Sequence, residues 1–234
     1  MILPGSQDPV LNFSLLHEEY NDGGLLVSQT CISSHLTILE FFLNDLVPNL
    51  EEMKESQPVY YINEEINEMD NILETVIQRM RTLQDEEDIK GQPNTNGSLI
   101  LKDHIAKQTM VDVERIINSG AVIHCRTTTP EFSTTSFTHS KLWGVTRNPW
   151  NLEYTPGGSS GGSGASLAAG CSTLATGSDI GGSIRIPASA CGLVGFKPPH
   201  GRNPQEAPFN HDQYCVVGPM ARTVEDCALM QNVM

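Results

Sequence analysis

Several features that define classes of proteins are missing from this sequence of 234 residues. It contains no run of about 18 apolar residues, so we expect no membrane-spanning helix. The N-terminus, MILPGSQDPV, lacks a basic stretch followed by an apolar one, which argues against a secretory signal and favours a cytoplasmic protein. The six cysteines form no CxxC pair and no HExxH motif is present, so nothing indicates a metal site.

Positive charge is scarce, and the imbalance is confined to one part of the chain. Residues 1–90 hold 18 acidic and 4 basic residues, whereas residues 91–234 hold 10 of each. No basic stripe is present, so we expect no nucleic-acid partner. Two interpretations of the acidic part stay open: the solvated face of helices, or a surface that binds a second copy of the chain or another partner chain.

The first part of the chain, residues 1–83, is predicted to be an acidic helical region. Apolar residues are dense between 36 and 46, and between 66 and 80 they recur at helical spacing with acidic residues between them. No strand is predicted in IQRMRTLQ, residues 77–84. Residues 84–98 are polar and rich in turn-forming residues, so we expect a loop there.

The second part, residues 84–234, has the pattern of an α/β protein. A helical pattern that stops at Gly120 is followed at once by the apolar strand candidate 121–125. Residues 163–176, rich in Ala and Ser, predict a helix that packs close to its neighbours. Thr223, followed by two acidic residues, is typical of an N-cap and predicts a C-terminal helix.

Two Gly/Ser clusters carry the chemical signal: residues 156–164, PGGSSGGSG, and residues 177–187, GSDIGGSIRIP. A phosphate-binding loop would need a Lys-Ser or Lys-Thr pair after the glycines, which is absent. A GxSxG nucleophile elbow needs the order Ser, acid, His, whereas His200 and His211 both precede Asp212. A serine nucleophile beside consecutive Gly amides remains as the interpretation that fits the residues.

The second cluster can supply both parts of such a site. Consecutive N–H groups at Ile180, Gly181, Gly182 and Ser183 can form an oxyanion hole. A serine hydroxyl needs a base to act as a nucleophile, and Ser159 or Ser160 of the first cluster can relay the proton.

These motifs identify a family resemblance. The run GGSSGGSGASLAAG…GSDIGGSIRIPASACGLVGFKPPHGR resembles the amidase signature family, which includes bacterial amidases, fatty acid amide hydrolases and the A subunits of glutamyl-tRNA amidotransferases. The resemblance covers about residues 84–234. It implies an α/β/α fold with a mixed sheet, incomplete in this chain because the pocket-forming C-terminal half of the family domain is absent.

The resemblance also implies a reaction and the residues that perform it. Ser183 falls on the nucleophile, and Ser159 falls on the bridging serine that family members hold in a cis peptide. Ile180, Gly181 and Gly182 fall on the oxyanion loop, with Ser160 as a further substrate-binding residue. The implied reaction is hydrolysis of a small-molecule amide through an acyl-enzyme, without metal or organic cofactor.

The base of the family triad, a lysine, has two candidate positions. In the register without gaps, the lysine position is Gln84, and a neutral amide cannot accept the proton. The alternative, Lys102 in LILKDH, resembles the Lys-Asp pair locally but requires deletion of a strand and loop. With Lys102 as base, the chain is an amidase with Ser183 and Ser159. With Gln84 in place, it is a catalytically dead or truncated relative that acts only in binding.

Overall fold

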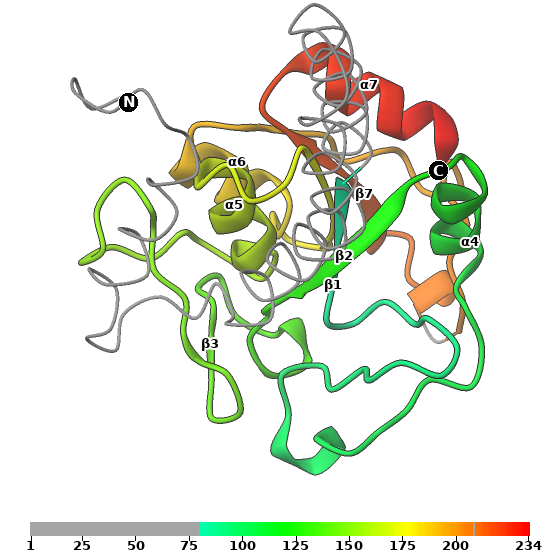
Figure 1. Ribbon diagram of the computed structural model, residues 1–234, viewed down its shortest axis with the longest axis horizontal. Helices are drawn as coiled ribbons and strands as arrows, with labels where there is room; N and C mark the ends of the chain where they lie inside the picture. Colours follow the sequence, from blue (N-terminus) through cyan, green and yellow to red (C-terminus); the bar gives the residue numbers. More distant parts are fainter. Residues whose placement is uncertain (1–79, 208) are drawn as a thin grey trace, which may run out of the picture.

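The computed structural model describes residues 80–207 and 209–234 (Figure 1). Almost all of the predicted acidic helical region, with its proposed interaction surface, lies outside the described residues. Within the described residues, no helix is both long and apolar enough to cross a membrane.

A mixed sheet of five strands forms the centre of the molecule, with the strand order β2-β1-β5-β7-β6. Strand β1 pairs parallel with both β2 and β5, whereas β7 pairs antiparallel with β5 and β6. The five strands are β1 (Met80–Gln84), β2 (Val122–Thr127), β5 (Leu174–Asp179), β6 (Val194–Gly195) and β7 (Val216–Ala221). A separate antiparallel pair consists of β3 (His139–Ser140) and β4 (Gly144–Val145).

Strand β1 was not predicted. The sequence pattern favoured a helix up to Met80 and no strand in residues 77–84, which is wrong. Met80 lies in the strand, next to the sheet centre. The pattern was missed because the strand is buried on both faces, so polar and apolar residues do not alternate. Thr82, Leu83 and Gln84 are each 0% exposed. The predicted boundary between residues 83 and 84 falls inside this strand.

Helices cover both faces of the sheet (Figure 1). The core on one face contains residues of α4 (Val111–Asn118) and α7 (Val224–Val233). The core on the other face contains residues of α5 (Gly161–Ala168) and α6 (Arg185–Cys191). The predicted α/β/α class with a mixed sheet is therefore confirmed. Three short 3-10 helices span Leu99–Leu101, Glu131–Ser133 and Phe209–His211.

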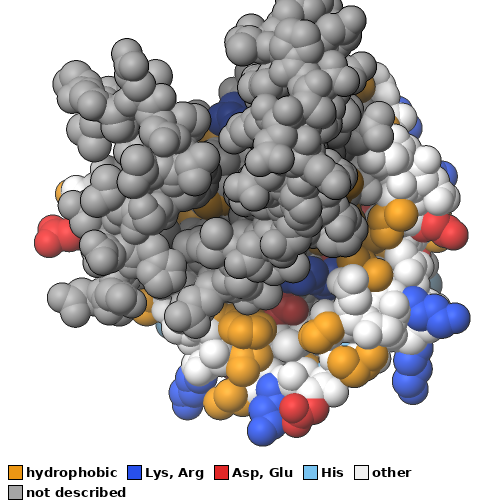
Figure 2. All heavy atoms as spheres, viewed as in Figure 1, with side chains coloured by type: hydrophobic (Ala, Val, Ile, Leu, Met, Phe, Trp, Pro, Cys, Tyr) orange, Lys and Arg blue, Asp and Glu red, His pale blue; other side chains and the backbone are white. Residues whose placement is uncertain are grey.

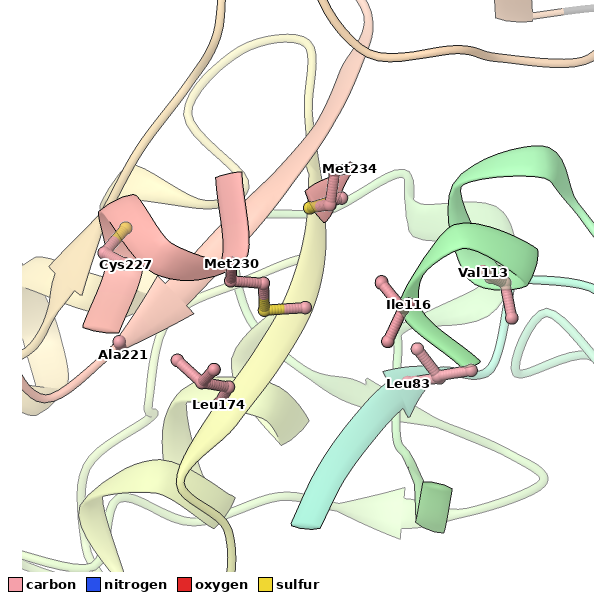
Figure 3. Packing of buried hydrophobic residues seen from close by; sticks show 8 residues of the cluster. All are labelled: Leu83, Val113, Ile116, Leu174, Ala221, Cys227, Met230 and Met234. Atoms are coloured by element: carbon pink, nitrogen blue, oxygen red, sulfur yellow. The ribbon is translucent and has the colours of Figure 1, made fainter. Parts of the chain in front are cut away.

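Alternation along the strands divides the core between the two faces. In β5, Leu174 packs on the α4 and α7 side, and the next residue, Ala175, packs on the α5 and α6 side. Figure 3 shows how Leu83 of β1 meets Ile116 of α4 within the first of these clusters. Both side chains are at least 98% buried, and full burial of such a residue contributes about 1.5–3 kcal/mol.

The other predicted elements are largely confirmed. Helix α4 ends just before Gly120, whose φ of 87° continues into β2 rather than into helix. Thr223 caps α7 by accepting a hydrogen bond from the N–H of Asp226 at 3.1 Å. The helix predicted over residues 163–176 is wrong at its end, because α5 stops before Gly170, with φ of 75°, and residues 174–176 belong to β5.

The described surface carries exposed apolar side chains among charged ones. Figure 2 shows them in separate groups between basic and acidic side chains. Ile100 is 82% exposed and Trp150 is 72% exposed. Scattered exposed apolar residues are usual on protein surfaces and define no interface by themselves.

Candidate active site

The two Gly/Ser clusters come together at the C-terminal ends of β1 and β5. Ser159 and Ser160 directly precede α5, and Ser183 lies in the loop between β5 and α6. The N–H of Ser160 donates to the carbonyl oxygen of Ser183 at 3.2 Å, which joins the two clusters directly. Two segments that are well separated in the sequence thus form one site.

The first cluster is held by Thr138, which directly precedes β3. The Thr138 hydroxyl oxygen lies 2.9 Å from the carbonyl oxygen of Gly157 and 3.1 Å from that of Ser159. It also accepts the N–H of Gly161 at 3.1 Å. The peptide bond between Gly158 and Ser159 is cis, which the family resemblance implied. Ser159 is fully buried, and its hydroxyl has no hydrogen-bond partner among the described residues.

Helix α5 begins with glycines because the chain next to it leaves no room for side chains. A Cβ atom added to Gly162 would lie 2.5 Å from the backbone nitrogen of Thr128 and closer still to the carbonyl oxygen of that residue. At the same end of α5, the hydroxyls of Ser163 and Thr127 form a hydrogen bond at 2.8 Å. This close packing fixes the position of Ser159 and Ser160 relative to the sheet.

Gln84, the last residue of β1, reaches the first cluster with its side chain. Its Oε1 accepts the Ser178 N–H at 3.1 Å and the Ser160 hydroxyl at 3.2 Å. Since a backbone N–H can only donate, the atom that faces Ser178 must be the amide oxygen, which fixes the orientation of the amide. The Gln84 Nε2 group is buried and has no partner among the described residues. Two buried polar groups, Nε2 of Gln84 and Oγ of Ser159, are therefore unsatisfied in one site.

Glu87 supports the backbone of Gln84 and not its side chain. Its Oε2 accepts the Gln84 N–H at 2.7 Å and also the hydroxyl of Thr176. Burial, together with the neighbouring carboxyl of Asp112, raises the pKa of Glu87 well above its ordinary range. Glu87 therefore favours the protonated, neutral form and stabilises the end of β1.

Asp179 organises the loop that follows β5. Its buried carboxylate accepts the N–H groups of Gly182 at 2.8 Å and Ile184 at 3.2 Å. Arg185 donates to both carboxylate oxygens at 2.9 Å, and the Lys197 ammonium lies 3.3 Å away. Burial alone raises the pKa of Asp179, but the hydrogen bonds from Arg185, Gly182 and Lys197 outweigh it and lower the pKa to about 2. The carboxylate is charged at neutral pH and holds the loop in one conformation.

The predicted oxyanion residues differ in what their N–H groups do. The N–H of Gly182 is bonded to Asp179. Ile180 is 52% exposed and Gly181 is also exposed, and no hydrogen bond takes the Gly181 N–H among the described residues. Ser183 itself is half-buried.

Lys102, the alternative base, lies directly after the 3-10 helix Leu99–Leu101. Its side chain is 58% exposed, and its Nζ lies 3.8 Å from Oδ2 of the adjacent Asp103. No contact connects it to Ser159 or Ser183 within the part of the chain that the structure describes. In residues 80–207 and 209–234, no group of three or more His, Cys, Asp or Glu side chains could hold a metal ion.

Three residues of this arrangement, Lys197, Thr138 and Glu87, could not be singled out from the sequence. Lys197 is a single cation in the otherwise uncharged stretch ACGLVGFKPP, and this isolation was the available signal. Thr138 gave no signal, because its contacts depend on how the chain between β2 and β3 folds over the glycines.

The fold and the paired serine loops are those of an amidase-type protein, and comparison with known proteins agrees. A family model described as Amidase matches residues 82–234. A glutamyl-tRNA(Gln) amidotransferase subunit of Methanosarcina acetivorans is 41% identical over 153 residues, which are 65% of this chain and 32% of that protein. Indoleacetamide hydrolase of Bradyrhizobium diazoefficiens is 42% identical over 160 residues, which are 65% of this chain and 30% of that protein.

Solved structures show the same relationship. The structure of 6-aminohexanoate cyclic dimer hydrolase with its substrate has a TM-score of 0.64 and 38% identity, over 66% of this chain and 34% of that one. A fatty acid amide hydrolase has a TM-score of 0.61 and 32% identity, over 65% of this chain and 28% of that one. The chain belongs to the amidase family. It spans about a third of the length of the relatives it matches.

Proposed function

We propose that this chain carries the acyl-transfer site of an amidase-type serine hydrolase, with Ser183 as the nucleophile and a small-molecule carboxylic amide as the substrate. The Ser183 oxygen forms a bond to the amide carbonyl carbon, and the bond from that carbon to nitrogen breaks. An acyl-enzyme on Ser183 and a free amine or ammonia result. Water then releases the acid and restores the serine. The direct hydrogen bond from Ser160 to Ser183 supports this assignment, because it brings the serine loops together.

Ser159 is the proton bridge in this proposal. It is fully buried and its hydroxyl has no competing partner among the described residues, so it is free to accept the Ser183 proton while it donates its own. The N–H groups of the loop Ile180–Ser183 that Asp179 leaves free bind the oxyanion, a contribution of about 3–4 kcal/mol for each well-placed donor; the Gly182 N–H is held by Asp179.

Gln84 limits this chemistry, and we place it, rather than Lys102, at the position of the family base. Its amide lies within hydrogen-bond distance of Ser160 and Ser178, whereas the Lys102 ammonium is exposed beside Asp103. Because an amide cannot take up a proton, the Ser183 proton has to pass through Ser159 directly to the leaving nitrogen. General-base assistance typically contributes about 10²–10⁴-fold, so acylation is expected to be slower by that order.

The same observation supports a second candidate function, amide binding without turnover. Loss of one member of a catalytic unit leaves substrate binding and oxyanion stabilisation in place. In that case the chain holds an amide at Ser183 and does not cleave it. Some relatives are named as subunits of an amidotransferase and are therefore parts of larger assemblies, which is compatible with a binding role.

A fluorophosphonate probe distinguishes the two candidates. The full chain is incubated with the probe and analysed by intact mass, beside a Ser183→Ala variant whose melting temperature matches. Slow labelling that disappears in Ser183→Ala supports the hydrolase. Absence of labelling in the folded full chain contradicts it and leaves the binding function, which amide binding measured by calorimetry then tests.

A further inference from the structure

Lys197, which follows β6, joins three segments around the oxyanion loop. Its ammonium donates to the carbonyl oxygens of Ile180 at 3.0 Å and Tyr214 at 2.8 Å, and lies 3.3 Å from Oδ1 of Asp179. An ammonium group has three hydrogens, and three acceptors surround it. Lys197 is therefore engaged as a cation and is not available as a proton acceptor in place of the missing base.

The contact with Ile180 sets the direction of a neighbouring N–H group. In a planar trans peptide, the carbonyl and the following N–H point in opposite directions. Because the Ile180 oxygen points to Lys197, the Gly181 N–H points away from Lys197. This N–H has no acceptor among the described residues, and Gly181 is exposed.

The other contacts in the loop show why the orientation of the Gly181 N–H matters most for a ligand. Asp179 takes the N–H of Gly182, so that group is not available to a ligand while this bond is intact. A cation at the Ile180 oxygen also polarises the Ile180–Gly181 peptide, which strengthens the N–H as a donor.

We infer that Lys197 is a positioning residue of the acyl-transfer site: its ammonium fixes and polarises the Ile180–Gly181 peptide so that the Gly181 N–H serves the oxyanion. This role rests on the proposed function of Ser183. Lys197 acts through this peptide. Its ammonium contacts the carbonyl oxygens of Ile180 and Tyr214 and the carboxylate of Asp179, and the Ile180 carbonyl lies opposite the Gly181 N–H.

Arg185 offers a matched control within the same network. It binds the Asp179 carboxylate twice at 2.9 Å, but it makes no hydrogen bond to the Ile180 carbonyl among the described residues. Lys197→Met removes the charge near Asp179 and the hydrogen bonds to Ile180 and Tyr214 together, at similar side-chain length. Arg185→Met removes only the contacts with Asp179. Lys197→Arg, which restores charge and donors, serves as the conservative variant.

Two measurements on the full chain test the inference. Ile followed by Gly occurs only once in the sequence, at Ile180-Gly181, so labelling with ¹³C-carbonyl Ile and ¹⁵N-Gly gives one NMR cross-peak for this peptide. The second measurement is the rate constant for fluorophosphonate labelling of Ser183, since the phosphoryl oxygen occupies the oxyanion position.

We expect Lys197→Met to move the Ile180 carbonyl resonance to lower frequency and to slow labelling by about tenfold or more. Arg185→Met should move the Ile180 carbonyl resonance less than Lys197→Met does. Lys197→Arg should restore part of both the resonance position and the labelling rate. The inference is overturned if the Ile180 carbonyl resonance of Lys197→Met does not move, or if this variant is labelled at a rate within about twofold of that of the unsubstituted chain. If the unsubstituted chain does not label, the proposed function fails separately. The resonance then decides alone whether Lys197 holds the peptide.

Discussion

Asp179→Asn is the substitution whose cost follows most directly from the structure. The carboxylate is fully buried and is held by Arg185, Lys197 and the N–H groups of Gly182 and Ile184. Its pKa of about 2 lies below the ordinary value of 3.8. At about 1.4 kcal/mol for each pKa unit, the charged form contributes about 2.5 kcal/mol to the free energy of unfolding at pH 7. Asparagine also turns one N–H donor group toward other donors, so we expect a total loss of about 3–4 kcal/mol.

The dependence of this loss on pH follows from the direction of the shift. A carboxyl whose pKa is lowered on folding stabilises the protein above the pKa of the unfolded chain, near 4, and this contribution disappears as the pH falls toward 2. Urea unfolding followed by the fluorescence of Trp143 and Trp150 measures it. The difference in the free energy of unfolding between the original chain and Asp179→Asn should narrow by about 1.8 kcal/mol from pH 4 to pH 2. The exposed Glu153→Gln is the control and should stay within about 0.5 kcal/mol of the original. A difference in the free energy of unfolding below about 1 kcal/mol at pH 7, or one that does not change with pH, would show that the Asp179 charge does not stabilise the fold in this way.

Three further predictions concern stability in the same assay. Because burial raises the pKa of Glu87, the original chain should lose stability relative to Glu87→Gln as the pH rises above about 4.5, and a constant difference would contradict this. Gly162→Ala should cost at least about 2 kcal/mol because its Cβ would strike the Thr128 backbone, whereas Gly181→Ala, with open space around it, should cost less than about 1. Burial lowers the pKa of His124 to about 4, so the original chain should lose about 2.6 kcal/mol of stability relative to His124→Gln between pH 6.5 and pH 4, and an unchanged difference would contradict this.

The Gly/Ser clusters could be predicted from the sequence because glycines and serines at fixed spacing report local backbone requirements. The α/β class also followed, since α4 and β2 adjoin in sequence and Gly120 marks the end of the helix. These features are local, so they are visible in the sequence without knowledge of the fold.

Features that depend on pairing between distant segments were missed. Strand β1 is buried on both sides by elements that come later in the chain, so its own residues carry no alternating pattern. Lys197 meets Ile180 and Tyr214 only because β6, β7 and the end of β5 are neighbours in the sheet. The contact of Gln84 with Ser160, 76 residues apart, is of the same kind.

We propose that Gln84 occupies the position of the family base, and one set of labelling rates can test this. The rate of fluorophosphonate labelling of Ser183 is measured for the unsubstituted chain and for the variants Gln84→Lys and Lys102→Met. The melting temperature of each protein shows whether it is folded. With Gln84 at the position of the base, Gln84→Lys should speed labelling by about 10²-fold or more, while Lys102→Met should leave the rate unchanged. Labelling that is lost in Lys102→Met and not increased in a folded Gln84→Lys would instead assign the base to Lys102.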